Sequence, residues 1–155
     1  MNNNTKNSEV NLYYIKSNFN NIALNLCKKL LDKKILIVLK DETEMVTLDK
    51  FLWTKEKDSF IPHKIISEKI YPKDNLILCH GDYSEIKGIS NYDVVLISPN
   101  IQIKRVLFLK KLFLFSYQKF EKSMYTEFYS KIKDKVSKLK CFYEYDILKW
   151  QSISN

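Results

Sequence analysis

Residues 41–66, DETEMVTLDKFLWTKEKDSFIPHKII, hold the strongest local pattern in the chain. Asp41 can accept a hydrogen bond from the free backbone N–H groups of a helix that follows it. Glu44 occupies the position of its capping-box partner. Apolar residues then recur at helical spacing and form one face: Met45, Leu48 and Leu52. The stretch therefore predicts a helix that begins after Asp41, ends near Thr54 and packs on a core.

A charged turn follows this helix and leads to the sequence SFIPH. Pro62 has no backbone N–H and disfavours helical geometry at the residue before it, so the helix cannot resume there. Trp53 and Phe60 are large rings at the two ends of the turn. Large aromatic side chains most often cover a core. Beside Pro62 and His63, however, these two rings also suit a recognition surface.

The residues before Asp41 predict a strand, a helix and a second strand. Alternating apolar residues indicate a strand over residues 10–15, and several possible N-caps precede a helical pattern that runs to residue 31. The continuous apolar run Ile35–Leu39 is typical of a strand that is buried on both faces. Together these elements form a βαβ unit, with residues 1–8 as a frayed polar tail.

The residues after His63 predict further buried strands and a long helix. Residues 76–79 and 94–97 are apolar runs that end at polar turns, and residues 106–112 fit a helix or a strand equally well. Residues 120–140 show helical periodicity, with Met124, Phe128, Ile132, Val136 and Leu139 on one stripe. We expect one α/β domain over residues 9–155, with a mainly parallel sheet flanked by helices.

The composition excludes several classes of site. The chain has 155 residues and only two glycines, so neither glycine-rich phosphate-binding loop can be present. Its three cysteines are widely spaced and fit buried thiols better than a zinc site. We therefore expect no cofactor and no metal. The polar N-terminus has no signal-peptide pattern and no apolar run is long enough to cross a membrane, so a cytoplasmic location is expected.

Candidate catalytic groups are few. Cys79 and His80 end a buried strand, but neighbouring side chains on a strand point to opposite faces, so a nucleophile–base pair would have to join Cys79 to His63. Asp82 and Glu85, with Asp93, are candidates for a magnesium site, although solvated loop acids explain them as well. No arrangement identifies an enzyme.

A second candidate surface lies on the predicted last helix. Lys131, Lys135 and Lys138 fall on one stripe, and Tyr129 lies near it. The net charge of +8 likewise favours an acidic partner. Lysines beside aromatic rings suit an acidic peptide that ends in a hydrophobic residue. They suit single-stranded nucleic acid equally well, so the residues leave both possibilities open.

The motif LDKFLWT followed by SFIPH resembles the chi subunit family of bacterial DNA polymerase III. A βαβ opening, the strand YDVVLIS and the closing residues YDILKW extend the resemblance over most of the chain. It implies a Rossmann-like fold without a phosphate loop, a last strand near Lys111–Ser116, and a non-catalytic replication subunit.

The resemblance also implies two partner-binding faces. Trp53, Phe60, Pro62 and His63 match the face that binds the psi subunit, and through it the clamp loader. A second face binds the acidic C-terminal tail of the single-stranded-DNA-binding protein. There the matching residues are Lys131, Lys135, Lys138 and Tyr129, with lysines in place of the family's arginines, which form bidentate contacts that lysine cannot. The alternative function is direct binding of single-stranded nucleic acid.

Overall fold

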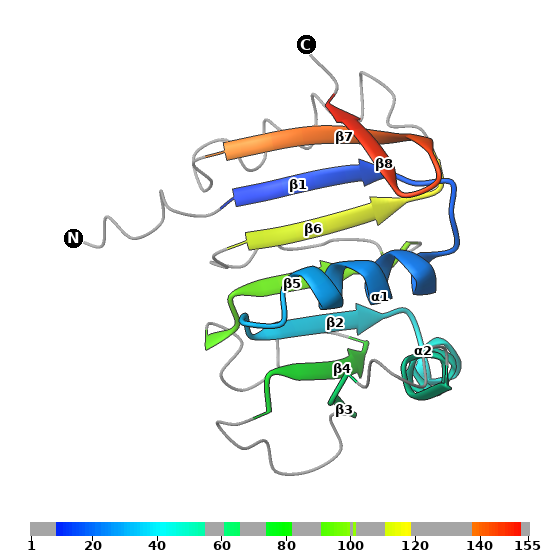
Figure 1. The fold of residues 1–155 in the computed structure, drawn as a ribbon, viewed down its shortest axis with the longest axis vertical. Helices are drawn as coiled ribbons and strands as arrows, with labels where there is room; N and C mark the ends of the chain where they lie inside the picture. The colour runs from blue at the N-terminus through cyan, green and yellow to red at the C-terminus, as the bar shows by residue number, and fades with distance from the viewer. Residues whose placement is uncertain are drawn as a thin grey trace, which may run out of the picture.

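The computed structural model describes residues 9–54, 61–65, 74–81, 91–99, 101, 111–118 and 138–152. Within them, eight strands form one sheet in the order β3-β4-β2-β5-β6-β1-β7-β8 (Figure 1). Neighbouring strands run parallel except the last pair, β7 and β8. The α/β fold class and the mainly parallel sheet predicted from the sequence are thus confirmed. The strands are β1 (Glu9–Tyr14), β2 (Ile35–Leu39), β3 (Lys64–Ile65), β4 (Leu76–His80), β5 (Val94–Ile97), β6 (Lys111–Ser116), β7 (Lys138–Asp146) and β8 (Lys149–Ser152).

Continuous apolar runs form the middle of the sheet. Every residue of β2 and β5 is buried, and β4 is buried up to its last residue. Because successive side chains of a strand alternate between faces, these runs supply two hydrophobic clusters, one on each side of the sheet. Leu96 belongs to the first cluster, for example, and its neighbour Ile97 to the second.

Two helices contribute to the first cluster. The first, α1 (Phe19–Lys29), lies across the sheet in Figure 1 and buries Ile22, Ala23 and Cys27. Asn18 is its N-cap, since its side-chain oxygen accepts a hydrogen bond from the Asn20 N–H at 2.9 Å. Neither described helix is long and apolar enough to cross a membrane.

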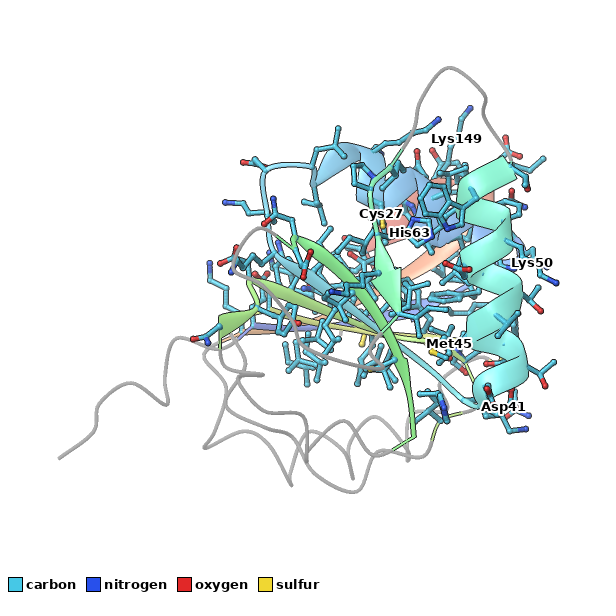
Figure 2. The ribbon with its side chains drawn as sticks, turned by 90° about the horizontal axis from the view of Figure 1, so that it is seen from below. Cys27, Asp41, Met45, Lys50, His63 and Lys149 are labelled. Atoms are coloured by element: carbon cyan, nitrogen blue, oxygen red, sulfur yellow. The ribbon has the colours of Figure 1, made fainter. Side chains whose placement is uncertain are left out.

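The second helix, α2 (Glu42–Thr54), confirms the element predicted from residues 41–66. It begins beyond the end of β2, with Asp41 at its start (Figure 2). The Asp41 carboxylate accepts the Glu44 N–H at 2.9 Å, as expected of a cap, but the Glu44 carboxylate accepts the Lys40 N–H, at 3.0 Å, and not that of Asp41. Met45, Leu48 and Leu52 are buried, as predicted.

The C-terminal part of the chain differs from the prediction. The predicted helix over residues 120–140 is wrong at its end, because Lys138, Leu139 and Lys140 are the first residues of β7. Residues 119–137 lie outside the described part. The strand predicted near Lys111–Ser116 is confirmed as β6, but it is not the last, since the β7–β8 hairpin follows. In the sheet, β7 pairs with β1 and extends the sheet beyond it.

Candidate partner-binding surface

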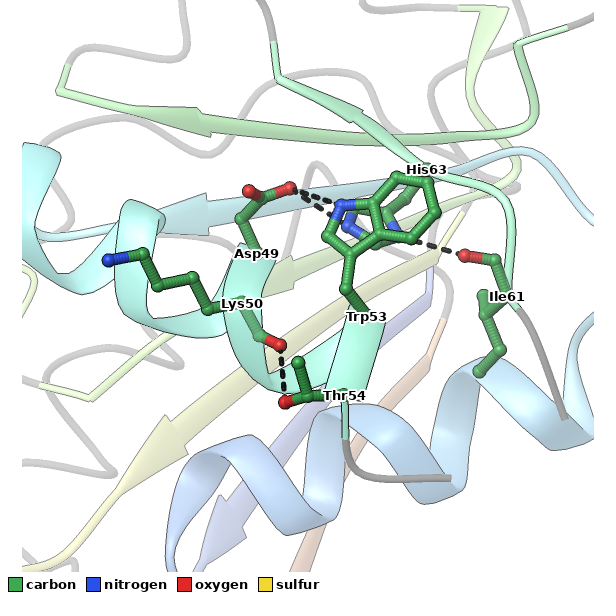
Figure 3. Close-up of polar contacts among 6 residues, drawn as sticks. All are labelled: Asp49, Lys50, Trp53, Thr54, Ile61 and His63. Atoms are coloured by element: carbon green, nitrogen blue, oxygen red, sulfur yellow. Dashed lines mark hydrogen bonds and ion pairs between the residues drawn. The ribbon is translucent and has the colours of Figure 1, made fainter. Parts of the chain in front are cut away.

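Trp53 lies in the last turn of α2 and has 46% of its surface exposed, whereas its neighbour Leu52 is buried. The indole is nevertheless held in place. Its Nε1–H donates a hydrogen bond to Asp49 Oδ1 at 3.1 Å, one helical turn earlier (Figure 3). This is an i, i+4 contact, so both residues stand on the same side of the helix.

His63 is bound to the same carboxylate. Its side chain is fully covered, with Nε2 2.9 Å from Asp49 Oδ1 and Nδ1 2.8 Å from the Ile61 carbonyl oxygen. Both of these oxygens are hydrogen-bond acceptors, so an N–H of the ring can donate to either of them. The His63 and Trp53 rings lie side by side, with centroids 4.7 Å apart. Asp49 thus joins α2 to the segment that leads into β3 (Figure 3).

This arrangement presents an aromatic surface that is already ordered. Ile61 is buried and fixes the segment to the core, whereas the next residue, Pro62, is exposed. An aromatic ring that is held before binding loses little conformational freedom when a partner covers it. Trp53 and His63, predicted to act together, are in contact, and Pro62 directly precedes His63 in the chain. Phe60 lies outside the described residues.

A cavity of about 360 Å³ adjoins the same segment. Residues 61–64 line it on one side, and the end of α1 lines it with Leu30 and Leu31, the latter 61% exposed. Lys64 and Asp74 also line it and form an ion pair at 3.6 Å. The cavity therefore offers apolar walls with charged groups nearby, which is the general composition of a partner-binding pocket.

The structure separates the residues considered for catalysis. Cys79 is buried in the second hydrophobic cluster, whereas His63 lies on the opposite side with α2. Burial raises the pKa of the Cys79 thiol to about 12, and the pKa of Cys27, which lines the cavity, to the same value. Neither thiol is a reactive thiolate near neutral pH. Cys79 and His63 therefore do not form the nucleophile–base pair that the sequence left possible.

The acidic residues considered for magnesium do not form a common site in the described part. The Asp93 carboxylate accepts the Lys34 N–H at 3.0 Å, just before β5 begins. Because β4 and β5 run in the same direction, Asp93 lies at the opposite edge from the end of β4. Asp82 and Glu85 lie outside the described residues. Among those described, no three potential metal ligands come together.

Sequence reasoning missed Asp49, although its spacing from Trp53 is a usable signal, because residues four apart are neighbours on a helix. Of the predicted tail-binding residues, only Lys138 is described, and it begins a strand instead of continuing a helical stripe. Lys131, Lys135 and Tyr129 lie outside the described residues, and their role remains a prediction.

A model of one protein family matches residues 8–123, and its description is the DNA polymerase III chi subunit, HolC. The match spans more than half of the 155 residues and includes both helices and the Trp53–His63 surface. It ends before β7. No curated protein matches the chain.

Proposed function

The chain belongs to the DNA polymerase III chi subunit family, and we propose that it is a non-catalytic subunit that links the clamp loader to the single-stranded-DNA-binding protein. The family match supports a role in replication. The absence of a glycine-rich phosphate loop and the inert buried thiols support a role in binding and not in catalysis. The proposed partners are psi or another clamp-loader component, and the acidic tail of the single-stranded-DNA-binding protein.

One observation carries the clamp-loader side of the proposal: an exposed indole is held in place by a partly buried aspartate that also contacts a covered histidine side chain. Tryptophan is enriched among the residues that dominate binding energy, because it buries a large area with few rotatable bonds. The nearby cavity, with Leu31 exposed beside it, can receive an apolar side chain of the partner. We propose that the psi-side partner covers Trp53 and Pro62.

Changing Trp53 to Ala tests this assignment. We expect affinity for the clamp-loader-side partner to fall at least about tenfold, in the range of binding hot spots. Because the ring is half exposed, stability should fall by only about 1 kcal/mol. The double variant Trp53→Ala, Phe60→Ala should bind still more weakly and remain folded. Binding is measured by surface plasmon resonance and folding by thermal unfolding.

Tyr145→Ala is the matched control, since this ring is 54% exposed on the β7–β8 hairpin, away from α2. It should leave binding unchanged. Cooperative loss of structure in the Trp53 variant would instead assign the indole to the core. Unchanged affinity in a folded Trp53 variant would remove this surface from the interface.

A further inference from the structure

A second cavity, of about 210 Å³, lies at the carboxyl ends of β2 and β5. Leu39 of β2 and Ser98 and Pro99, which follow β5, line it, together with the first turns of α1 and α2. The chain leaving β2 leads to β3 and β4 on one side of this strand pair, whereas the chain leaving β5 leads to β6 on the other side. In open α/β sheets, ligands bind outside the carboxyl ends of strands where connections diverge in this way.

A buried polar group at this cavity has no partner. Ser98 is 2% exposed, and among the described residues its Oγ finds no hydrogen-bond partner. By strand alternation it follows Ile97 of the second cluster, so its side chain belongs on the face that α1 and α2 cover. That is the side on which the cavity is lined by the two helices. A buried hydroxyl without a partner lowers stability, so its presence in a native structure calls for an explanation, and a bound ligand is one.

The cavity does not suit a phosphate. None of the described residues that line it is lysine or arginine, and Glu44 contributes a carboxylate. The first N–H groups of α1 are already used, since Phe19 N–H donates to Tyr117 Oη at 2.8 Å and Asn20 N–H donates to the Asn18 cap. The start of α1 therefore offers an anion no free N–H among these residues, and Glu44 would repel it.

The lining groups favour a flat, uncharged ligand that carries N–H donors. Glu44 and Thr47 offer acceptor oxygens, the Ser98 hydroxyl lies covered at the cavity wall, and the Tyr117 ring, 42% exposed, offers an apolar face. The volume lies below the roughly 300–1,000 Å³ of sites for drug-sized ligands, which limits the occupant to one small ring system. We propose that this cavity binds a nucleobase, with an amino group donating to Glu44 and the ring stacked on Tyr117. The base is that of a free nucleoside or of a single-stranded nucleic acid.

Two threonines of α2 provide a matched pair of variants. Thr47 Oγ1 and Thr54 Oγ1 each donate to the carbonyl oxygen four residues earlier, at 2.8 Å, and both residues are exposed. Of these two threonines, Thr47 lines the cavity and Thr54 does not. Thr47→Leu should fill the entrance and weaken binding of adenosine, guanosine or cytidine at least about tenfold, whereas Thr54→Leu should change it less than about twofold. Uridine, which lacks an amino group, should bind more weakly by about three- to tenfold, the effect of one hydrogen bond.

Binding is followed by titrating each nucleoside into the full chain and recording amide chemical shifts. A single-stranded oligonucleotide is titrated in parallel. If the oligonucleotide binds more tightly than the nucleosides and is weakened by Thr47→Leu, the base comes from nucleic acid. If only nucleosides bind, the ligand is a free base or nucleoside. The proposal is wrong if no nucleoside or oligonucleotide binds. It is also wrong if Thr47→Leu changes neither the nucleoside affinity nor the oligonucleotide affinity.

Ser98→Ala adds a test in which stability and binding change in opposite directions. Removing a buried hydroxyl without a partner should raise the melting temperature, while nucleoside affinity should fall about three- to tenfold. A higher melting temperature with unchanged affinity would show that the hydroxyl serves no ligand and would overturn its assigned role.

Discussion

Glu144 is a buried carboxylate that joins the C-terminal hairpin to the chain between β1 and α1. Its Oε1 accepts N–H groups from Lys16 at 2.6 Å and Ser17 at 2.7 Å. Its Oε2 accepts the Ser17 hydroxyl at 2.5 Å and the Leu148 N–H at 2.8 Å. Leu148 has a positive φ of 55°, a conformation that an L-residue rarely adopts, and its N–H is held by this carboxylate. Glu144 is therefore a structural link across the carboxyl edge of the sheet.

Glu144→Gln should destabilise the protein by about 2–4 kcal/mol, because an amide nitrogen would replace one of two oxygens that each accept two donors. Urea unfolding at neutral pH measures the loss. Asp32→Asn is the control, since Asp32 is largely exposed and its nearest cation, Lys33, lies 4.0 Å away. It should change stability by less than about 0.5 kcal/mol. Equal stability of wild type and Glu144→Gln would show that these hydrogen bonds contribute nothing.

The same carboxylate makes stability depend on pH in a defined direction. Burial alone would raise its pKa, but the hydrogen bonds from Ser17, Lys16 and Leu148 outweigh it and lower the pKa below the ordinary value of 4.5. A lowered folded-state pKa contributes stability above pH 4.5 that is lost as the pH falls through the folded-state value. The wild type should therefore lose stability on acidification more steeply than Glu144→Gln. Parallel curves would contradict this.

At the scale of elements, the β7–β8 hairpin completes an aromatic cluster on the face of the sheet that carries the first hydrophobic cluster. Tyr13 of β1 stacks on Phe142 of β7 at 5.0 Å between centroids and meets Trp150 of β8 edge-on at the same distance. Burial, with Glu9 adding to it, raises the pKa of Tyr13 to about 12, so this ring stays neutral. In Figure 1, β8 turns back across β7, which places it at this cluster.

Trp150→Ala should lower stability by about 2–3 kcal/mol, because a partly buried ring would leave a gap beside Tyr13. Ile147→Ala, in the turn of the same hairpin, should have an effect of less than about 0.5 kcal/mol, because Ile147 is 77% exposed. Thermal or urea unfolding compares the two. Equal effects would mean that the hairpin does not pack on the sheet in solution.

The elements predicted correctly from the sequence are those with strong local patterns. The strands β2, β4 and β5 are short apolar runs between polar turns, and α2 has both a cap and a stripe, so local signals were sufficient. The hairpin was missed because Leu139 fits two periods. It lies three residues after Val136, as in a helix, and two before Cys141, as in a strand. Leu139 is in a strand and not a helix because β7 pairs with β1, more than one hundred residues away in the chain.

The candidate site shows the same contrast between local patterns and long-range contacts. Trp53 and His63 were proposed as binding residues from the sequence motif that holds them, but whether the indole is core or surface depends on how α2 packs. Asp49 has a local signal in its spacing from Trp53, but its contact with His63 depends on tertiary packing, and Glu144 gives no local sign that it will be buried. Glu144 bonds to groups 127 and 128 residues away, a distance over which no local pattern carries information.

At the scale of the whole molecule, the net charge of +8 fits two different partners: the acidic tail of the single-stranded-DNA-binding protein and single-stranded nucleic acid itself. Each makes a distinct prediction about salt. A tail whose terminal hydrophobic residue is buried derives part of its energy from apolar area, so added salt should weaken it moderately. For a single strand bound through its phosphates, the logarithm of the binding constant should fall linearly with the logarithm of the salt concentration. The slope should be about −0.7 for each phosphate contacted.

We expect a labelled peptide that copies the tail to bind, and the variant Lys131→Glu with Lys135→Glu to abolish that binding, because attraction becomes repulsion at close range. Lys16→Glu with Lys40→Glu, at two exposed positions near the carboxyl edge of the sheet, makes the same change in net charge and should weaken peptide binding far less.

Removing only the terminal hydrophobic residue of the peptide should also abolish most of the binding, because the charges remain while the buried side chain is lost. Labelled peptide and labelled oligonucleotide are titrated against the same protein at two salt concentrations. Tight binding of the oligonucleotide together with no measurable binding of the peptide would replace the linking role with direct nucleic-acid binding, since a protein that joins the clamp loader to coated single strands must recognise the coat.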